Sequence, residues 1–161
     1  MKHACYVDID SPVGPLRLVA DDGGLRRIDF LKTKVKVDAS WREDAAALKE
    51  TLHQLRLYFA GELEEFDLVL APEGTSFQLG VWHQLCKIPY GETISYGELA
   101  KRVGNPKASR AVGLANGSNP IPIIIPCHRV IGSNGKLTGY GGGLPIKEKL
   151  LALERRQLRL L

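Results

Sequence analysis

The residues best suited to chemistry in this chain are three consecutive ones, Cys127, His128 and Arg129. A thiol with an ordinary pKa of roughly 8.5 is only a few per cent ionised at neutral pH, so a nucleophilic cysteine needs a base or a positive charge beside it. The adjacent imidazole and guanidinium supply both. The three residues alone also fit a buried structural cysteine next to an incidental histidine.

Three further side chains suit the same chemistry. Glu154 falls on or near the packed face of the last predicted helix, where a carboxylate needs a partner. The alternative is an exposed glutamate paired with Lys149 or Arg155. Tyr96 offers a phenol that can donate a hydrogen bond, or else an aromatic that packs at a helix start. Asn119 precedes a proline, and on its own an asparagine in that position is a turn residue.

The first half of the chain predicts an α/β domain. Short apolar runs separated by turn signals predict strands at residues 5–9, 16–20 and 25–30, which form an antiparallel meander. One more strand is expected at 66–70. Apolar residues spaced alternately three and four apart predict a helix over 45–59. A Pro-Glu-Gly linker at 72–74 divides the chain into domains 1–74 and 75–161.

The second half predicts a mostly helical domain. Ser76 is expected to cap the first helix, Ser95 and Glu98 form a capping box for the second, and Asn105-Pro106 breaks the chain before the third. The helices are expected at 76–85, 95–104, 108–116 and 145–156. The two central helices form a candidate helix-turn-helix. Prolines predict an extended segment at 121–126, and 133–135 predicts a hairpin turn.

Composition limits the kinds of partner. The net charge is +4, but residues 1–74 carry 10 Lys/Arg against 14 Asp/Glu, whereas residues 75–161 carry 12 against 4. A basic half joined to an acidic one indicates that the basic half faces a polyanion, unless its charge serves only solubility. Three cysteines are too few for a disulfide framework. Without an apolar run of membrane-spanning length or a signal-peptide core, we expect a cytoplasmic protein with no membrane partner.

Several motifs resemble one protein family. Residues 125–131, Ile-Pro-Cys-His-Arg-Val-Ile, resemble the active-site signature of the O6-alkylguanine-DNA alkyltransferases. Residues 106–113 resemble the recognition helix of that family, Asn119-Pro120 its hinge and Gly139-Tyr140 its substrate-pocket loop. The similarity runs from about Phe77 to Glu154. The first half resembles the variable N-terminal domain, mainly through Asp10-Ser11-Pro12 and Gly14. The resemblance implies an RNase H-like N-terminal domain and a winged helix-turn-helix C-terminal domain.

The resemblance assigns the catalytic roles. Cys127 would attack the alkyl carbon and keep the alkyl group as a thioether, which requires an exposed and activated sulfur that a nucleotide can reach. His128 would act as the base through a water molecule, oriented by Glu154. Tyr96 would donate a hydrogen bond to the leaving guanine, and Asn119 would link the recognition segment to the cysteine loop. No cofactor is implied.

The resemblance also implies how DNA is bound. The target base must leave the duplex, at a cost of a few kcal/mol, and Arg110 would fill the space that it vacates. Ala111 and Gly113 leave the recognition helix with little bulk, which suits the minor groove, and Lys107 lies at the start of the same segment. The expected partner is double-stranded DNA that carries O6-alkylguanine, bound by a monomer.

The pocket loop departs from the family pattern at one position. Many relatives carry a serine after the tyrosine that corresponds to Tyr140, but this chain has Gly141, whose backbone N–H could still donate to O6 of the base. The carbonyls of Cys127 and Val130 would recognise the exocyclic amine of guanine.

A metal site is not expected. The candidate ligands by residue type are His3, Cys5, His83 and Cys86. They form no paired zinc motif, and the positions where some relatives bind zinc in the N-terminal domain hold Asp21 and Arg26.

The expected function is direct-reversal DNA repair, an irreversible single-turnover transfer from O6-alkylguanine, and also from O4-alkylthymine, to Cys127. One alternative is a non-catalytic protein that binds alkylated guanine, although such relatives replace the acceptor cysteine, typically with tryptophan. A winged-helix transcription factor would not need residues 126–129. A thiol hydrolase that uses Cys127 and His128 would turn over and would not need DNA.

Overall fold

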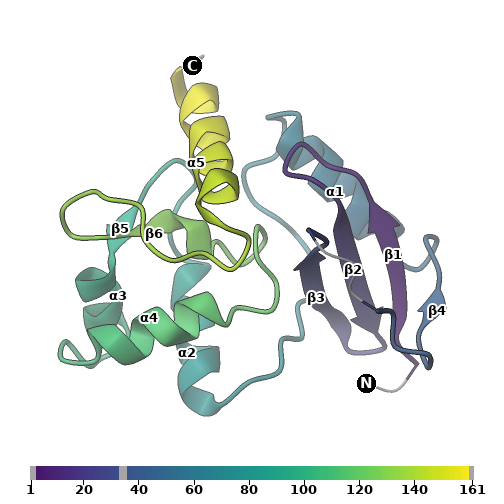
Figure 1. The fold of residues 1–161 in the computed structure, drawn as a ribbon, viewed down its shortest axis with the longest axis horizontal. Helices are drawn as coiled ribbons and strands as arrows, with labels where there is room; N and C mark the ends of the chain where they lie inside the picture. Colours follow the sequence, from purple (N-terminus) through teal and green to yellow (C-terminus); the bar gives the residue numbers. More distant parts are fainter. Residues whose placement is uncertain (1–2, 33–35, 160–161) are drawn as a thin grey trace. The chain divides into compact units, whose positions relative to one another are not determined.

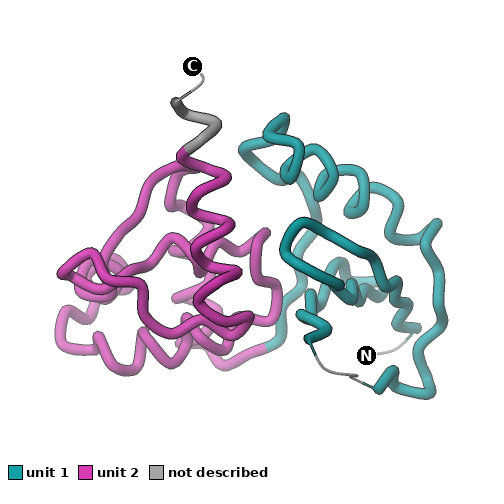
Figure 2. The backbone as a smooth tube through the Cα atoms, turned by 45° about the horizontal axis from the view of Figure 1, so that its top comes forward, with its two compact units in different colours: residues 1–73 teal, residues 74–161 magenta. Residues whose placement is uncertain are grey.

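The computed structural model describes residues 3–32 and 36–159. It divides into two compact units, residues 1–73 and 74–161 (Figure 2). No helix in the described part of the chain is long and apolar enough to cross a membrane.

Unit 1 is built on a four-stranded sheet. The strands are β1 (Cys5–Ile9), β2 (Leu16–Asp21), β3 (Gly24–Phe30) and β4 (Arg42–Glu43), in the order β3-β2-β1-β4 (Figure 1). The first three strands pair antiparallel, which confirms the predicted meander. The short β4 pairs parallel to β1 and was not predicted, because two exposed polar residues carry no strand pattern.

The helix α1 (Lys49–Phe59) follows the strands of this sheet in the chain. It begins four residues later than predicted, since the Asp44 side chain accepts the N–H of Ala47 and holds the preceding residues in a turn. Leu52, Leu55 and Tyr58 form its buried side.

The strand predicted over 66–70 is wrong. Only Leu70 forms a bridge, to Leu25. Instead, the side chain of Gln54 on α1 forms two hydrogen bonds with the backbone of Asp67. It accepts the N–H at 2.8 Å and donates to the carbonyl at 2.9 Å. A glutamine therefore satisfies the polar groups that a neighbouring strand would otherwise pair.

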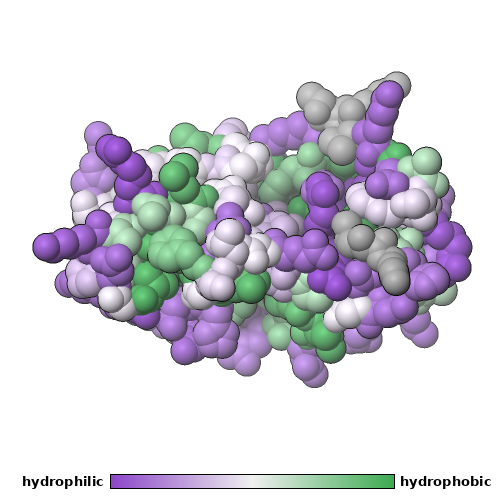
Figure 3. Space-filling model, turned by 90° about the horizontal axis from the view of Figure 1, so that it is seen from below, coloured by the Kyte–Doolittle hydropathy of each residue, from purple (hydrophilic) through white to green (hydrophobic). Residues whose placement is uncertain are grey.

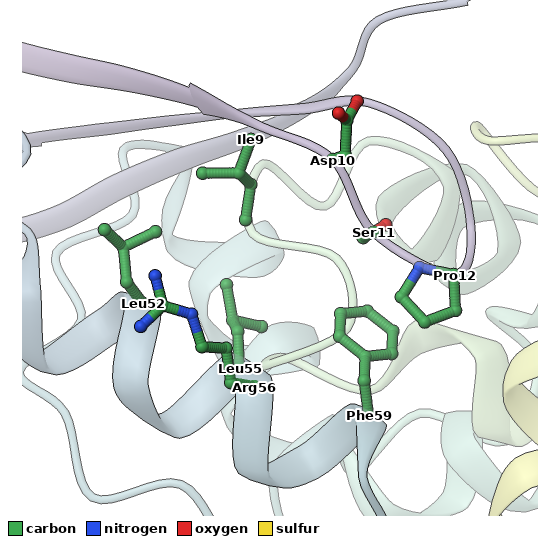
Figure 4. A pocket seen from close by; sticks show the side chains of 8 residues that line it. All are labelled: Ile9, Asp10, Ser11, Pro12, Leu52, Leu55, Arg56 and Phe59. Atoms are coloured by element: carbon green, nitrogen blue, oxygen red, sulfur yellow. The ribbon is translucent and has the colours of Figure 1, made fainter.

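A cavity of about 420 Å³ lies in unit 1 between the loop after β1 and α1 (Figure 4). Its lining residues are Ile9, Asp10, Ser11, Pro12, Leu52, Leu55, Arg56 and Phe59. On the helix side Leu52, Leu55 and Phe59 are apolar and Arg56 adds a charged group, while the Asp10 carboxylate points away from the helix (Figure 4).

Unit 2 is mostly helical. Its helices are α2 (Ser76–Leu85), α3 (Tyr96–Arg102), α4 (Ser109–Gly117) and α5 (Leu144–Arg159). Thr75, not Ser76, caps α2, since its hydroxyl accepts the N–H of Gln78 in a full capping box. The Ser95 side chain caps α3 by accepting the N–H of Glu98, but the predicted capping box is incomplete, since the Glu98 carboxylate accepts from Arg102 instead. A turn over 103–108 joins α3 to α4, and the Trp82 indole of α2 donates to the Ala115 carbonyl of α4 at 2.8 Å.

The segment 121–126 is a turn, so the predicted extended conformation is wrong. The N–H of Ile125 donates to the carbonyl of Ile121 at 2.9 Å. Ile123 has a φ of 75°, a left-handed conformation that strains a β-branched residue. The strain is tolerated where the surroundings fix the backbone, and every residue from 121 to 130 is buried.

The turn leads directly into the segment with the candidate site. The short helix η1 (Cys127–Arg129) is followed by β6 (Val130–Ile131), which pairs parallel with β5 (Ile94–Ser95). Because Tyr96 follows β5, this pairing joins the cysteine segment to the start of α3. The predicted turn at 133–135 is present, with the N–H of Gly135 donating to the carbonyl of Gly132 at 2.9 Å.

Candidate active site

Cys127 is the first residue of η1 and is only 5% exposed. Burial raises the pKa of its thiol to about 11, against opposing contributions from hydrogen bonds with the side chains of Asn119 and Tyr140 and from the charge of Lys147. The expectation of an exposed sulfur is therefore wrong for this structure, in which Cys127 is buried. With such a pKa, roughly one thiol in ten thousand is ionised at neutral pH, so nucleophilic chemistry here requires a base.

His128 and Glu154 lie in hydrogen-bond contact. The Nε2 atom of His128 is 2.7 Å from Oε2 of Glu154, and both side chains are buried. Burial lowers the pKa of His128, outweighing the opposite effect of Glu154, so the imidazole is neutral at neutral pH. Because an ionised carboxylate can only accept a hydrogen bond, the ring proton of the neutral imidazole lies on Nε2 and its lone pair on Nδ1. Among the residues described, Nδ1 has no hydrogen-bond partner.

Arg129 shares the same carboxylate. Its Nε donates to Oε1 of Glu154 at 2.8 Å, its Nη2 donates to Oε2 at 3.1 Å, and its Nη1 donates to the carbonyl of Ile88 at 2.7 Å. Burial alone would raise the pKa of Glu154, but its hydrogen bonds with His128 and Arg129 and the charge of Arg129 lower it to about 2. Glu154 is therefore an anion at neutral pH that neutralises Arg129 and orients His128.

Two asparagines hold the backbone around the cysteine. The amide of Asn119 donates to the Ile125 carbonyl at 2.8 Å, and its oxygen accepts the N–H of Ile121 at 3.0 Å. Asn116, on α4, donates to the carbonyl of Cys127 at 3.4 Å. The end of α4 and the turn after it therefore fix the position of the thiol.

Two tyrosines lie at the loop that follows β6: Tyr140 is part of it, and Tyr96 contacts it from the start of α3. Tyr140 is in hydrogen-bond contact with the Cys127 thiol, and burial, together with that thiol, raises the pKa of its phenol. Tyr96 meets Thr138, to whose carbonyl its hydroxyl donates at 3.4 Å. A Cβ added at Gly141 would approach its nearest neighbour, the Gly117 carbonyl, at 3.8 Å, which is an ordinary contact. Steric exclusion does not explain the absence of a serine there.

The candidate DNA-contacting residues lie on the surface of unit 2. Lys107, Arg110 and Ala111 are exposed, and Gly113 is half-buried against the ring of Tyr96. Within the described residues, Arg110 has no hydrogen-bond or ion-pair partner. Among the residues of this unit whose exposure the structure describes, the large exposed apolar side chains are Phe77, Leu79, Leu114 and Leu144. Hydrophobic and hydrophilic groups are interspersed on the face that Figure 3 displays.

The structure thus brings together Cys127, His128, Glu154, Asn119 and Tyr140, with Val130 just after them. Sequence reasoning missed three contributors, namely the shared role of Arg129, the amide of Asn116 and the buried Lys147. The last had a signal, because Lys147 precedes Leu150 by three residues and Glu154 by seven, which places all three on one face of α5.

Asp21 and Arg26, which stand where some relatives bind zinc, form an ion pair. Nε of Arg26 lies 2.9 Å from the Asp21 carboxylate. In the described ranges, no three His, Cys, Asp or Glu side chains gather as metal ligands.

These contacts define the class of the protein first: a buried cysteine followed in sequence by the histidine of a buried His–Glu pair, residue types that covalent catalysis by a thiol uses. The family follows from comparison with known proteins. The family described as 6-O-methylguanine DNA methyltransferase matches twice, its DNA-binding domain over residues 76–156 and its ribonuclease-like domain over residues 1–72. The chain belongs to this family.

Relatives agree along nearly the whole chain. The methylated-DNA–protein-cysteine methyltransferase of Methanosarcina acetivorans is 60% identical over 151 residues, which cover 92% of this chain and 97% of the relative. A crystal structure of the Mycobacterium tuberculosis O6-methylguanine methyltransferase is 51% identical, with a TM-score of 0.89 and 98% of each chain covered. A structure described as Mycobacterium tuberculosis OGT in complex with DNA is 53% identical, with a TM-score of 0.86, and covers 96% of this chain and 94% of that one.

Proposed function

We propose that this protein reverses alkylation damage in DNA by moving the alkyl group from O6 of guanine to the sulfur of Cys127. The observation that carries the proposal is the 2.7 Å contact of His128 with Glu154 directly beside Cys127. A thiol with so high a pKa needs a neutral base, and this pair provides one. The function that the relatives' names describe agrees with this site.

The reaction is a displacement in which charges and atoms balance. The lone pair of Nδ1 of His128 accepts the thiol proton through a water molecule, and the sulfur forms a bond to the alkyl carbon. The bond from that carbon to O6 breaks, and its electrons pass to the guanine. Tyr96 donates a hydrogen bond to the leaving base. The thioether is not hydrolysed, so each molecule reacts once.

Recognition of the base uses backbone groups. The carbonyls of Cys127 and Val130 accept the exocyclic amine of guanine, and the N–H of Gly141 donates to O6. Asn119 keeps the recognition segment and the cysteine loop in register, and Tyr140 lines the pocket. O4-alkylthymine presents a similar alkylated oxygen and is a second expected substrate.

Double-stranded DNA binds to the helical half through the minor groove. α4 carries Ala111 and Gly113, whose small size permits close approach, while Arg110 takes the place of the extruded base. Lys107 contributes charge to a half-chain whose surplus of Lys and Arg favours phosphates. α3 and α4 then act as a helix-turn-helix within a winged domain of residues 75–161.

The remaining assignments are predictions of the same kind. Residues 1–74 serve as an RNase H-like scaffold with no direct part in the transfer, since their charge is net negative. The protein acts as a monomer in the cytoplasm.

The decisive experiment is the intact mass of the protein after incubation with a duplex that contains O6-methylguanine. We expect a gain of one methyl group per molecule, abolished by Cys127→Ser and retained by the control Cys86→Ser, which alters an exposed cysteine. Repeated turnover without a gain in mass would indicate a hydrolase. Tight binding without either change would indicate a protein that only recognises the lesion.

A further inference from the structure

Asn116 is a buried asparagine whose amide is only half satisfied. It lies near the end of α4 and is 2% exposed. Its Nδ2 atom donates to the carbonyl of Cys127 at 3.4 Å, whereas none of the residues that the structure describes donates to its Oδ1 atom. Asn119, by contrast, uses both ends of its amide, at 2.8 and 3.0 Å. A buried acceptor without a donor is costly, so this oxygen points to a donor that arrives with a ligand.

The neighbours of Asn116 belong to the proposed base pocket. Its Nδ2 atom faces the Cys127 carbonyl, the group expected to accept the exocyclic amine of guanine. The next residue, Gly117, faces the pocket loop, because a Cβ added at Gly141 would lie 3.8 Å from the Gly117 carbonyl oxygen. Gly141 is the residue whose N–H is expected to donate to O6. The end of α4 therefore contacts both the cysteine segment and the pocket loop, with Asn116 where the amine is expected.

The carbonyls expected to meet the amine already accept other donors. The Cys127 carbonyl accepts the N–H of Val130 as well as the amide of Asn116, and a carbonyl oxygen has two lone pairs. The Val130 carbonyl accepts Nζ of Lys147 at 2.6 Å, and the same Nζ donates to the Thr138 carbonyl at 2.9 Å. The amine of guanine therefore meets one lone pair on Val130 and none on Cys127, unless a donor leaves.

Asn116 is the donor that can leave. Its 3.4 Å contact with the Cys127 carbonyl is longer than the roughly 2.7–3.2 Å of an ordinary N–H···O hydrogen bond, whereas Val130 donates from the backbone that closes η1. A half-turn of the amide about its Cβ–Cγ bond exchanges Nδ2 and Oδ1, two atoms of nearly equal size, so it requires no additional space. After this turn the amide oxygen faces the arriving amine.

We propose that Asn116 selects purines that carry an exocyclic amine: its Nδ2 holds the Cys127 carbonyl in the free protein and gives way to the base, whose amine then donates one N–H to Oδ1. The inference rests on the proposed transfer from guanine to Cys127. Asn116 takes no part in the movement of the proton, which passes from the thiol to His128. A base without the amine leaves Oδ1 unpaired, so the site discriminates against it.

The test compares two free substrates that differ only in the amine. These are O6-benzylguanine and 6-benzyloxypurine, which has a hydrogen in place of the amino group. Transfer of the benzyl group is followed by mass spectrometry of the Cys127 peptide, and the ratio of the two rates measures recognition of the amine. Asn116→Leu replaces the amide with an apolar group of similar size, and Asn116→Ala removes it. Asn105→Leu, at an exposed position before α4, is the matched control.

We expect the original protein and Asn105→Leu to favour O6-benzylguanine to the same extent. In Asn116→Leu and Asn116→Ala this ratio should fall at least about tenfold, because the amine loses one hydrogen bond. The rate with 6-benzyloxypurine should fall much less, since that substrate makes no contact with Oδ1.

An unchanged ratio in the folded variants would overturn the proposal, because a residue that only supports the backbone slows both substrates alike. A higher ratio would also overturn it, since Asn116 would then only compete with the amine. Failure of both variants to fold, judged by circular dichroism, would overturn it by assigning Asn116 to stability. If the original protein takes a benzyl group from neither purine, the proposed function fails as well. If it takes the group from both at equal rates, only this inference fails.

Discussion

His128 and Glu154, 26 positions apart in sequence, meet through a hydrogen bond of 2.7 Å in the interior of unit 2. The same carboxylate receives two hydrogen bonds from Arg129. Because Arg129 balances the charge of Glu154, the imidazole can stay neutral while its orientation is fixed. A neutral histidine is the form that can accept a proton from a thiol of high pKa.

Replacing Glu154 with glutamine should affect both stability and reactivity. Glu154→Gln leaves the buried Arg129 guanidinium without a counter-ion, at a cost of about 3–5 kcal/mol in the free energy of unfolding. It also removes the anion that holds the proton on Nε2 of His128, so alkyl transfer to Cys127 should slow at least about tenfold. Urea unfolding and single-turnover transfer measure the two effects.

The matched control for this prediction is Glu148→Gln, an exposed carboxylate on the same helix. It should change the unfolding free energy by less than about 0.5 kcal/mol. An unchanged transfer rate in Glu154→Gln would remove Glu154 from the proposed mechanism and leave it a structural residue.

Stability should decrease as the solution is acidified, in two stages. Burial lowers the pKa of His128 below its ordinary 6.5, so below that pH the unfolded chain binds a proton that the folded protein resists. The pKa of Glu154 is lowered from 4.5 to about 2, so its stabilisation is fully present above pH 4.5 and is lost as the pH falls toward 2. Urea unfolding between about pH 7 and pH 2 should show a falling midpoint.

The Glu154→Gln variant again supplies the comparison. Below pH 4.5 its stability should depend less on pH than that of the original protein, because it lacks the carboxylate that takes up a proton. Identical pH dependence in the two proteins would contradict the assigned ionisation of Glu154.

Local sequence patterns predicted the elements whose cause is local. The meander of β1 to β3 and the start of α3 at Ser95 depend on alternation, turn residues and a capping side chain close in sequence. The strand over 66–70 and the extended segment over 121–126 were wrong because distant or irregular contacts decide them. The Gln54 side chain forms hydrogen bonds with the backbone of Asp67, and the Asn119 side chain forms hydrogen bonds with the backbone of the turn that follows it.

The same distinction applies to the candidate site. Cys127, His128 and Glu154 could be named from a motif and a helical position, and the structure brings His128 and Glu154 into contact. Lys147 shares a face of α5 with Leu150 and Glu154, but its two carbonyl partners could not be named, because no sequence pattern reports them. The burial of the thiol likewise depends on side chains from separate segments.

Asn119 offers a test of how the cysteine segment is held. Asn119→Ala would leave the Ile125 carbonyl and the Ile121 N–H without these partners, at a cost of about 1–3 kcal/mol in unfolding free energy. We also expect slower alkyl transfer, because the backbone before Cys127 loses its support. Asn105→Ala is the control, since Asn105 is exposed and its side chain accepts the N–H of Lys107 at a longer distance, 3.3 Å. Equal losses of stability in the two variants would contradict this role.

A substitution at Arg110 tests the extrusion of the base separately from the transfer reaction. Arg110→Ala should slow repair of O6-methylguanine in a duplex much more than transfer from free O6-benzylguanine, because only the duplex requires a base to be flipped out. It should also reduce the salt dependence of DNA binding by about one ion. Lys101→Ala, an exposed lysine on α3, is the control for a general loss of charge. Arg110 lies on the surface of α4, whereas the hydrogen bonds around Cys127 come from other side chains. Equal slowing with both substrates would therefore mean that Arg110 does not act in extrusion.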